Sequence, residues 1–327
     1  MKKSAKNRII IWSVVSVILI GILISGMSLF NHFTFGKIQI GVFEIGTDFS
    51  NFERGNAEFD YSTIKNLHIN WSSGSVNIKE STTDKIKIYE DAVSENDRMY
   101  YKLTGNGTLE IYDKKKAFTL IGIGVNSNNK NLTVEVPNKA ALFDTEVLAA
   151  SANVEITDYR SQDMAIGTVS GNIEILNIKG TNLELDTASG TVTAYKCDYS
   201  DIETNSVSGR TTINTYSTCG SFEADSVSGE VEVFFENAYN NNKLVDCRLK
   251  KIGINSVSGG VEVNLPTEIE GFTAELSSVS GAKSVNFNGT QYDDKTVYGN
   301  GKTDIDIETV SGKIEINRNE ENNKEYR

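Results

Sequence analysis

The chain contains few of the residues on which metal sites, disulfide frameworks and general bases depend. Its 327 residues include only two histidines, three cysteines and two prolines. An odd number of cysteines without a closely spaced pair supports neither a disulfide framework nor a zinc signature. The charge is also one-sided, with 44 acidic residues against 32 basic ones and a net charge of -12. A chain this acidic lacks the basic face that phosphate backbones require, which argues against nucleic acid as a partner.

The sequence contains no recognisable catalytic motif. It has no Gly-x-Ser-x-Gly elbow, no Gly-x-x-x-x-Gly-Lys-Ser/Thr loop and no His-Glu-x-x-His helix, and its histidines, His32 and His68, have no partnered nucleophile. Carboxylate pairs such as Glu184 and Asp186 do occur, but they recur along the chain as an architectural feature would. We therefore predict a protein that is not an enzyme, with no catalytic, cofactor-binding or metal-ligating residues. A carbohydrate-active enzyme is the weaker alternative.

A tripeptide of the form Val-Ser-Gly recurs along the second half of the chain. Its glycines are Gly171, Gly190, Gly209, Gly229, Gly259, Gly281 and Gly312, at intervals of 19, 19, 20, 30, 22 and 31 residues. An earlier copy ends in alanine, Ala150-Ser151-Ala152, and a degenerate copy stands at Ser72-Ser73-Gly74. A period near 20 indicates a repeat protein in which each unit forms one turn of a stack.

Apolar residues alternate on both sides of each Ser-Gly pair. Around Gly190 they are Leu183 and Leu185 before the glycine and Val192 and Ala194 after it. This spacing of two predicts two short strands that share one apolar face and meet at a Ser-Gly corner. We therefore predict an all-β fold, a β-solenoid of stacked two-strand coils in which the seven glycines are structural corner residues. A β-sandwich is the alternative.

Two intervals between glycines exceed the period and leave room for insertions, at 236–251 and 286–302. Insertions on a regular stack are where repeat proteins often carry a binding surface, although solvated loops without a specific role are tolerated equally well. Acidic residues recur on the polar side of the strands, as at Glu184, Glu203 and Glu223. Stacking would align them into columns that either keep the protein soluble or attract cations.

The cysteines lie inside the repeat region. Cys197 and Cys247 each precede a corner glycine by twelve residues, a position that Tyr159 and Ile178 occupy in other units. This predicts a packed column in which a free thiol is buried. A disulfide between neighbouring coils, joining Cys197 to Cys219, is the alternative.

The longest apolar run lies near the N-terminus. A basic cluster (Lys2, Lys3, Lys6 and Arg8) precedes residues 9–30, which are all apolar apart from Ser and Gly. As a helix these residues would extend about 33 Å, enough to cross the hydrocarbon core of a bilayer. The basic cluster predicts a cytoplasmic N-terminus and an extracellular repeat domain. A cleaved signal peptide is the alternative, although the run is longer than a typical signal core and no Ala-x-Ala site follows it.

These features predict five segments. They are a basic cytoplasmic N-terminus (1–8), a transmembrane helix (9–30), a juxtamembrane spacer or cap (31–63), a β-strand-repeat domain (64–317) and a polar tail (318–327). We therefore predict a single-pass membrane protein that is anchored in the bilayer by residues 9–30.

The repeat region resembles the bacterial β-strand-repeat family labelled putative adhesin, a domain family of unknown function. The resemblance rests on Leu109-Glu110-Ile111, on the strand from Leu132 to Pro137, and on the Ser-Gly-x-Val-x-Val units between Ser151 and Ile316. Chains with this anchor-plus-repeat layout are similar to membrane-anchored proteins of cell-envelope stress operons in Gram-positive bacteria. The resemblance implies an envelope location, and it transfers no active-site residues.

Together these observations predict a non-catalytic module that binds or scaffolds at the cell envelope, with an envelope protein or a wall polymer as its partner. The alternative is an accessory or sensor protein of an envelope stress response that acts through a membrane partner.

Overall fold

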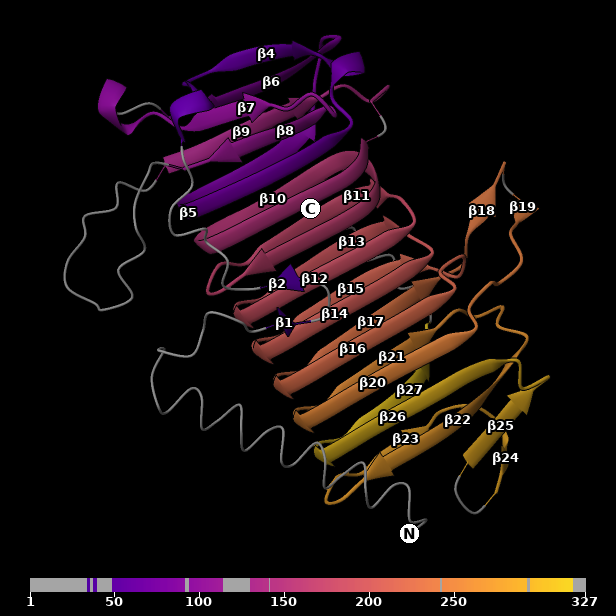
Figure 1. The fold of residues 1–327 in the computed structure, drawn as a ribbon. Coiled ribbons are helices and arrows are strands. Elements are labelled where there is room, and N and C mark those ends of the chain that lie inside the picture. Colours follow the sequence, from indigo (N-terminus) through magenta and orange to yellow (C-terminus); the bar gives the residue numbers. More distant parts are fainter. Residues whose placement is uncertain are drawn as a thin grey trace.

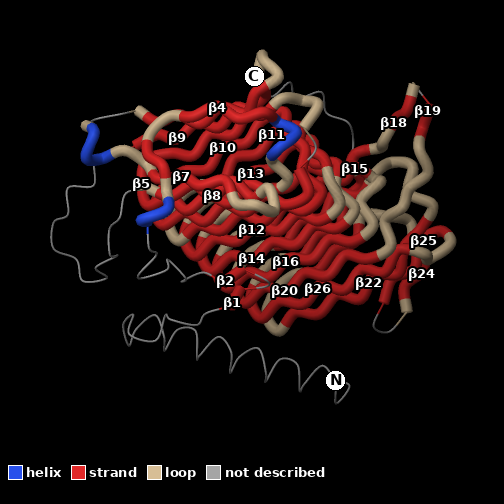
Figure 2. The backbone as a smooth tube through the Cα atoms, turned by 45° about the horizontal axis from the view of Figure 1, so that its top comes forward, coloured by secondary structure: helices blue, strands red, loops and turns tan. Residues whose placement is uncertain are grey.

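The computed structural model describes residues 34–35, 38–39, 49–91, 94–113, 130–140, 142–241, 243–292 and 295–319. The apolar run at 9–30, which we predict to be a transmembrane helix, lies outside these residues. Within the described ranges, no helix is long and apolar enough to cross a membrane. Strands make up most of the described chain, and its short 3-10 helices are η2 (Phe49–Asn51), η3 (Tyr61–Thr63) and η4 (Glu95–Asp97) (Figure 2).

Two rows of parallel strands run along the molecule, and each coil contributes one strand to each row (Figure 1). In spatial order, sheet A contains β8 (Thr108–Tyr112), the start of β5 (Asn66–Glu80), the two ends of β10 (Leu142–Thr168), β12 (Asn182–Ser189), β14 (Asp201–Ser208), β16 (Ser221–Ser228), β20 (Lys251–Ser258), β26 (Thr303–Ser311) and β22 (Gly271–Ser278).

Sheet B contains the strands that follow the Ser-Gly corners. They are β9 (Lys130–Val136), the end of β5, the middle of β10, β11 (Ile173–Lys179), β13 (Val192–Asp198), β15 (Thr211–Tyr216), β17 (Val231–Glu236), β21 (Val261–Leu265), β27 (Ile314–Arg318) and β23 (Lys283–Val285). The two long strands, β5 and β10, pass through a corner without a break and so belong to both sheets.

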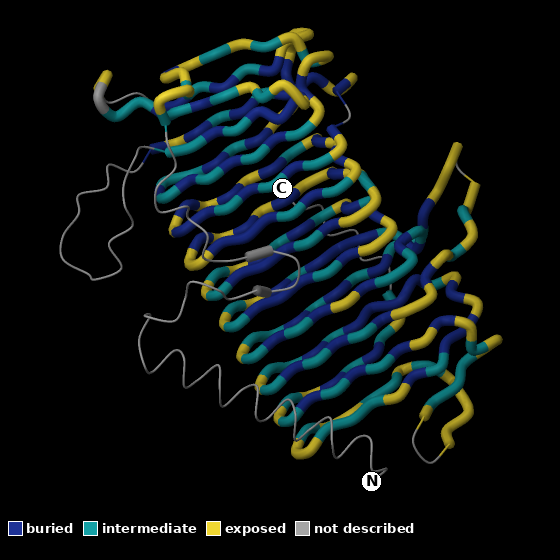
Figure 3. Tube along the Cα trace, viewed as in Figure 1, coloured by how far each residue is buried: buried dark blue, intermediate teal, exposed yellow. Residues whose placement is uncertain are grey.

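The core lies between the two sheets and is built from columns of equivalent residues. In sheet A, Leu183 pairs in register with Ile202, and Ile202 with Phe222, and all three are buried. Buried and exposed residues alternate along most strands (Figure 3), as the spacing of two in the sequence predicts. Stacking gives each column apolar neighbours above and below, which a single two-stranded coil lacks. The all-β class and the stacked two-strand coils predicted from the repeat are thus present.

The predicted corner glycines form one line along the stack, where sheet A passes into sheet B. A Cβ atom added to Gly190 would lie 2.2 Å from the carbonyl oxygen of Gly171, and one added to Gly209 would lie 1.9 Å from the carbonyl oxygen of Gly190. The peptide group of the neighbouring coil therefore occupies the space that a side chain would need. In the alanine copy, the carbonyl oxygen of Ala152 faces Gly171 in the same way.

The coils do not stack in the order of the chain at either end. The coil of β26 and β27 lies between the coil of β20 and β21 and that of β22 and β23, since Ile305 pairs with Ile252 on one side and Ala274 on the other. Likewise β5 lies between β10 and the coil of β8 and β9, because Val76 pairs with both Val154 and Leu132. The connections at these ends, 286–302 among them, are long enough to reach back past one coil.

Antiparallel strands extend both sheets at the N-terminal end of the stack and sheet A at its C-terminal end. At the C-terminal end, the insertion 286–302 forms β24 (Thr290–Gln291) and β25 (Lys295–Gly299), and β25 pairs with the outer edge of β22. At the other end, β7 (Tyr100–Leu103) and β3 (Glu53–Arg54) extend sheet A, while β6 (Lys85–Glu90) and β4 (Ala57–Asp60) extend sheet B. A covered edge has fewer unpaired backbone N–H and C=O groups with which a strand of another chain could pair. Residues 49–63 of the predicted spacer or cap belong to this N-terminal cap.

Two short antiparallel pairs lie outside the parallel rows. They are β1 (Thr34–Phe35) with β2 (Ile38–Gln39), and β18 (Tyr239–Asn240) with β19 (Lys243–Leu244). The second pair is the insertion 236–251, and it projects from the stack (Figure 1).

Cys197 lies in the predicted buried column, whereas Cys247 does not. Tyr159, Ile178 and Cys197 pair in register and are buried, as predicted. Cys247 instead lies in the segment between β19 and β20, because the insertion before Lys251 interrupts the twelve-residue count. All three cysteines are free thiols. Burial raises the pKa of the Cys219 thiol to about 12, so this thiol is protonated and unreactive at neutral pH.

Candidate functional site

A groove of about 900 Å³ runs along the corner opposite the glycine line, where strands of sheet B end and strands of sheet A begin. The middle of β10 and the ends of β11, β13 and β15 form its length, and the residues of and beside the β18–β19 hairpin form one wall. The buried rings of Tyr159 and Tyr199 form part of its floor, with the Tyr199 hydroxyl donating to the carbonyl oxygen of Ser161 at 3.1 Å. The groove is thus a fixed feature of the stack with an inserted segment at its side.

A bulge recurs on three successive coils at the edge of the groove. The backbone φ angles of Asp158, Asn177 and Lys196 are 51°, 55° and 54°, a left-handed conformation that non-glycine residues seldom adopt. Between buried Ile156 and buried Tyr159, two residues face outward instead of one, which is the geometry of a bulge. Side chains that would otherwise alternate are thereby directed together to the groove side of the stack.

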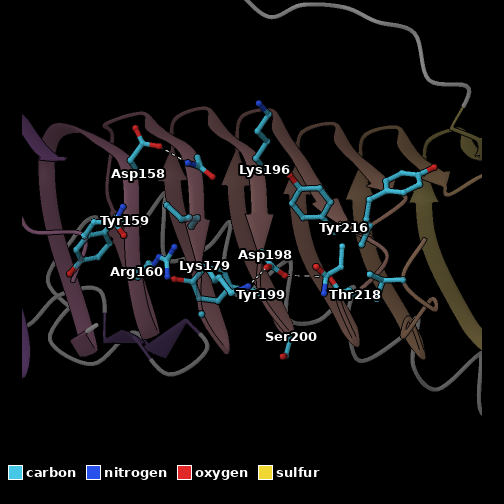
Figure 4. A pocket seen from close by; sticks show the side chains of 18 of the residues that line it. Asp158, Tyr159, Arg160, Lys179, Lys196, Asp198, Tyr199, Ser200, Tyr216 and Thr218 are labelled. Carbon is cyan, nitrogen blue, oxygen red and sulfur yellow. Dashed lines mark hydrogen bonds and ion pairs between the residues drawn. The ribbon is translucent and has the colours of Figure 1, made fainter. Parts of the chain in front are cut away.

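The polar residues of the groove are unevenly paired. Asn177 donates a hydrogen bond to the carboxylate of Asp158, and the Nζ of Lys179 lies 2.6 Å from Oδ2 of Asp198 (Figure 4). The hydroxyl of Thr218 donates to the other oxygen of Asp198 at 3.3 Å. By contrast, three exposed cations of the lining form no ion pair within the described chain: Arg160, Lys196 and Arg248.

Two further tyrosines flank these cations. Tyr216, at the end of β15, is half-buried, and burial raises the pKa of its hydroxyl, with smaller contributions from Glu236 and Asp198. Tyr239, on β18, is 56% exposed and pairs in register with exposed Leu244. Tyrosines of this kind present a flat apolar ring and a polar tip to a ligand. The groove therefore combines unpaired positive charge with accessible aromatic surface.

The family of the chain follows from its repeat region. Residues 64–317 match the family model described as Toastrack DUF4097, and this match covers most of the chain. The chain belongs to this Toastrack family. No curated protein matches it significantly.

Several solved structures are similar to the chain. One is a putative cell adhesion protein from Clostridium sporogenes ATCC 15579, with 12% identity over 82% of this chain and 99% of that chain, at a TM-score of 0.31. A second is a putative lipid binding protein from Parabacteroides distasonis ATCC 8503, with 16% identity over 82% and 97% of the two chains and a TM-score of 0.46. A third, a putative adhesin from the same organism, is 10% identical over 81% and 97%, with a TM-score of 0.41.

The predicted corner glycines of the Toastrack domain lie away from the groove, at the opposite corner. The insertion 236–251 beside the groove is predictable from the repeat spacing, whereas the groove cations are not among the predicted site residues. The sequence feature that marks this edge of the groove is a change in the spacing of the inward-facing residues. Successive inward residues are here three positions apart instead of two, at Ile156 and Tyr159, Ile175 and Ile178, and Ala194 and Cys197. A spacing of three at the same place in successive repeats is the sequence signature of a recurrent bulge.

The predicted carboxylate columns of the Toastrack domain lie on the outer face of sheet A. Glu184 pairs in register with Glu203, and Glu203 with Glu223. In the adjacent column asparagines separate the acids, and Nδ2 of Asn205 donates to Oδ1 of Asp186 at 2.9 Å. Burial raises the pKa of Asp186 to about 8. No group of three or more metal-ligating side chains in the described part of the chain could hold an ion.

His68 lies at the N-terminal end of this acidic face, whereas His32 falls outside the described residues. The Nε2 of His68 lies 2.9 Å from Oδ2 of Asp144, while Glu110 and Glu146 are its register neighbours on the two adjoining strands. The hydrogen bond to Asp144 is the largest effect and raises the pKa of the imidazole above its usual 6.5. Burial is the next-largest effect and opposes it, and the charges of Glu146, Asp144 and Glu110 add smaller upward contributions. His68 is therefore a partner of the acidic columns.

We expect His68→Gln to lower the stability of the protein at acidic pH and to have little effect at alkaline pH. Because the folded pKa is raised, the stabilisation is fully present below pH 6.5 and is lost as the pH rises through the folded pKa. Urea unfolding of both proteins between about pH 5 and pH 9 measures the difference. Asp144→Asn should remove the same pH dependence. If the difference in unfolding free energy between the wild type and His68→Gln stayed constant with pH, the raised pKa of His68 would be contradicted.

Proposed function

We propose that this chain is a membrane-anchored, non-catalytic binding module on the outer side of the cell membrane, and that the groove beside the β18–β19 hairpin is its binding surface. The groove itself carries this proposal, since it combines unpaired cations and accessible tyrosines on a rigid stack. The basic cluster at 2–8 followed by the apolar run 9–30 supports the anchor and its orientation.

The position of the groove supports a binding role. Its length is made of strand ends that every coil of the stack holds in place, so a ligand would meet a preformed surface. Its wall is the insertion 236–251, and insertions on one side of a repeat stack are common carriers of binding surfaces. The other insertion, 286–302, pairs with β22 as an end cap and has a structural role instead.

Shortening the hairpin tests the proposal. Ala238 and Val245 are already joined, because the amide of Val245 donates to the carbonyl oxygen of Ala238 at 2.8 Å, so Tyr239–Leu244 can be replaced by Gly-Gly. We expect the full-length chain with this shortened hairpin to keep its melting temperature and to lose binding to an envelope preparation. Pull-down from solubilised membranes and from purified cell wall, with and without calcium, measures binding.

Two tyrosines give a matched pair of point variants. Tyr239 is 56% exposed beside the groove, and Tyr292 is 55% exposed in the other insertion. Tyr239→Ala should weaken binding to the envelope preparation, whereas Tyr292→Ala should not. Full binding by the shortened hairpin variant would overturn the groove as the binding surface. Binding that instead depends only on residues 1–30 would favour an accessory protein that acts through a membrane partner.

A further inference from the structure

We infer that the groove binds a linear polyanion, a single extended chain that carries phosphate or carboxylate groups along its length. This inference rests on the proposed function, in which the groove is the binding surface, and it specifies the chemistry of the ligand. Charge, shape and backbone conformation support it independently.

The charge of the groove is opposite to that of the protein. The chain has a net charge of -12, and several cations elsewhere on its surface have carboxylate partners, such as Arg210 with Glu230 and Lys302 with Glu270. Others outside the groove, such as exposed Lys65 and Lys295, have no ion pair among the described residues. In the groove, Arg160, Lys196 and Arg248 form no such pair among the described residues. Unpaired cations held on one surface of an acidic protein attract anions, and the guanidinium groups match phosphate and carboxylate geometry.

The lining has four cations, Arg160, Lys179, Lys196 and Arg248, against three carboxylates, Glu80, Asp158 and Asp198, so its formal charge is +1. Within the described residues, none of these carboxylates forms an ion pair with Arg160, Lys196 or Arg248. Asp158 accepts from Asn177, and Asp198 is engaged by Lys179 and Thr218. Moreover, Arg160 and Lys179 are register neighbours on β10 and β11, so two like charges lie on adjacent strands. Like charges in this position repel, and a bound anion would relieve the repulsion.

The shape of the groove favours a thin, extended ligand. Its lining passes over five neighbouring strands of sheet B, β5, β10, β11, β13 and β15, from Glu80 to Tyr216. At about 4.8 Å between strands, this is a length of about 19 Å. A volume of about 900 Å³ over that length leaves room for one polymer chain, not for a double helix or a globular partner. The tyrosines Tyr216 and Tyr239 offer ring faces to the backbone of such a chain.

The backbone at the groove is held in an uncommon conformation. Asp158 and Asn177 are residue types that tolerate positive φ, but Lys196, with φ of 54°, is not. Such strain persists only where the surrounding structure enforces it, and it is typical of functional surfaces. Here the bulge places exposed Lys196 on the same side of the groove as Asp158 (Figure 4).

The test uses the full-length chain in a non-ionic detergent with polymer probes of defined chemistry. The probes are inorganic polyphosphate, poly-glutamate, monomeric phosphate and neutral dextran, and binding is measured by titration calorimetry at several salt concentrations. We expect polyphosphate, poly-glutamate or both to bind, dextran and monomeric phosphate to bind far more weakly, and added salt to reduce the affinity. The comparison of the first two probes tells phosphate from carboxylate recognition.

Two triple variants separate the groove from net charge. Arg160→Gln, Lys196→Gln and Arg248→Gln combined should weaken polyanion binding about tenfold or more. The matched control combines Lys85→Gln, Lys302→Gln and Lys313→Gln, which removes three surface cations outside the groove, and it should change the affinity less than about twofold. Equal losses in both variants, or no binding of either polyanion by the wild-type chain, would overturn the inference. If the groove triple variant still binds the envelope preparation while the shortened hairpin variant does not, the ligand assignment fails and the proposed function stands.

Discussion

Gly209→Val is expected to lower the free energy of unfolding by about 3 kcal/mol or more. The backbone φ of Gly209 is 138°, outside the range that a β-branched residue adopts. The new Cβ atom would also lie 1.9 Å from the carbonyl oxygen of Gly190. This oxygen belongs to the backbone of the adjoining coil and cannot rotate away as a side chain would, so two coils would have to separate.

A second glycine of the stack provides the control. Gly253 lies within β20, and a Cβ atom there would meet only side-chain atoms of Lys251 and Glu223, at 3.8 and 3.9 Å. Gly253→Val should therefore change the stability by less than about 1 kcal/mol, or raise it, since valine favours strands. Urea unfolding followed by circular dichroism measures both variants. Similar losses for the two glycines would show that the line of corner glycines has no special role.

Much of this fold could be predicted because each coil repeats the same local chemistry. The alternation around Gly190 gives two strands, and the recurrence of the corner gives their stacking. The inserted order of the terminal coils could not be predicted, because the residues that pair with Ile305, namely Ile252 and Ala274, are equally apolar and would accept either neighbour. Equivalent repeats carry no information about which of them are adjacent when a long connection permits more than one order.

The groove was harder to predict than the fold for a related reason. Arg160 and Arg248 each precede a corner glycine by eleven residues and Lys196 precedes one by thirteen, but another coil has an aspartate, Asp198, at the eleven-residue offset, so the charge itself does not repeat. Lys196 lies at the bulge, Arg160 lies two residues after the bulge residue of its own coil, and Arg248 belongs to an insertion whose path the period does not specify. The acidic columns, in contrast, were predictable because every member keeps the same offset from its glycine.

The N-terminal cap contains a buried ionic cluster that the repeat does not account for. The Nζ of Lys130 lies 3.0 Å from Oε2 of Glu90 and 2.6 Å from Oδ1 of Asp113, and it donates to the carbonyl oxygen of Asp97 at 2.8 Å. The side chains of Lys130 and Glu90 are 5% and 0% exposed. The ammonium group also lies 5.1 Å from the ring centre of Trp71, within cation–π range. One lysine therefore joins three segments of the cap to the first coil.

Lys130→Met is expected to lower the free energy of unfolding by about 3–5 kcal/mol. The methionine fills a similar volume, so the loss comes from the charge and not from a cavity. Without the ammonium group, the carboxylate of Glu90 would stay buried without its ion pair, although the amide of Met99 would still donate to its Oε1 at 2.5 Å. Urea unfolding at neutral pH, read by the fluorescence of Trp71 beside the cluster, measures the effect.

The exposed pair of Lys79 and Glu135 separates this effect from a general loss of charge. Their atoms are 3.6 Å apart, and the lysine side chain is 48% exposed, so Lys79→Met should cost less than about 1 kcal/mol. A triple variant that combines Lys130→Met with Glu90→Gln and Asp113→Asn should recover part of the lost stability, because it leaves no buried charge unpaired. If Lys130→Met were as mild as Lys79→Met, the cluster would not hold the cap to the stack, and the aromatic and backbone contacts of the cap would have to do so instead.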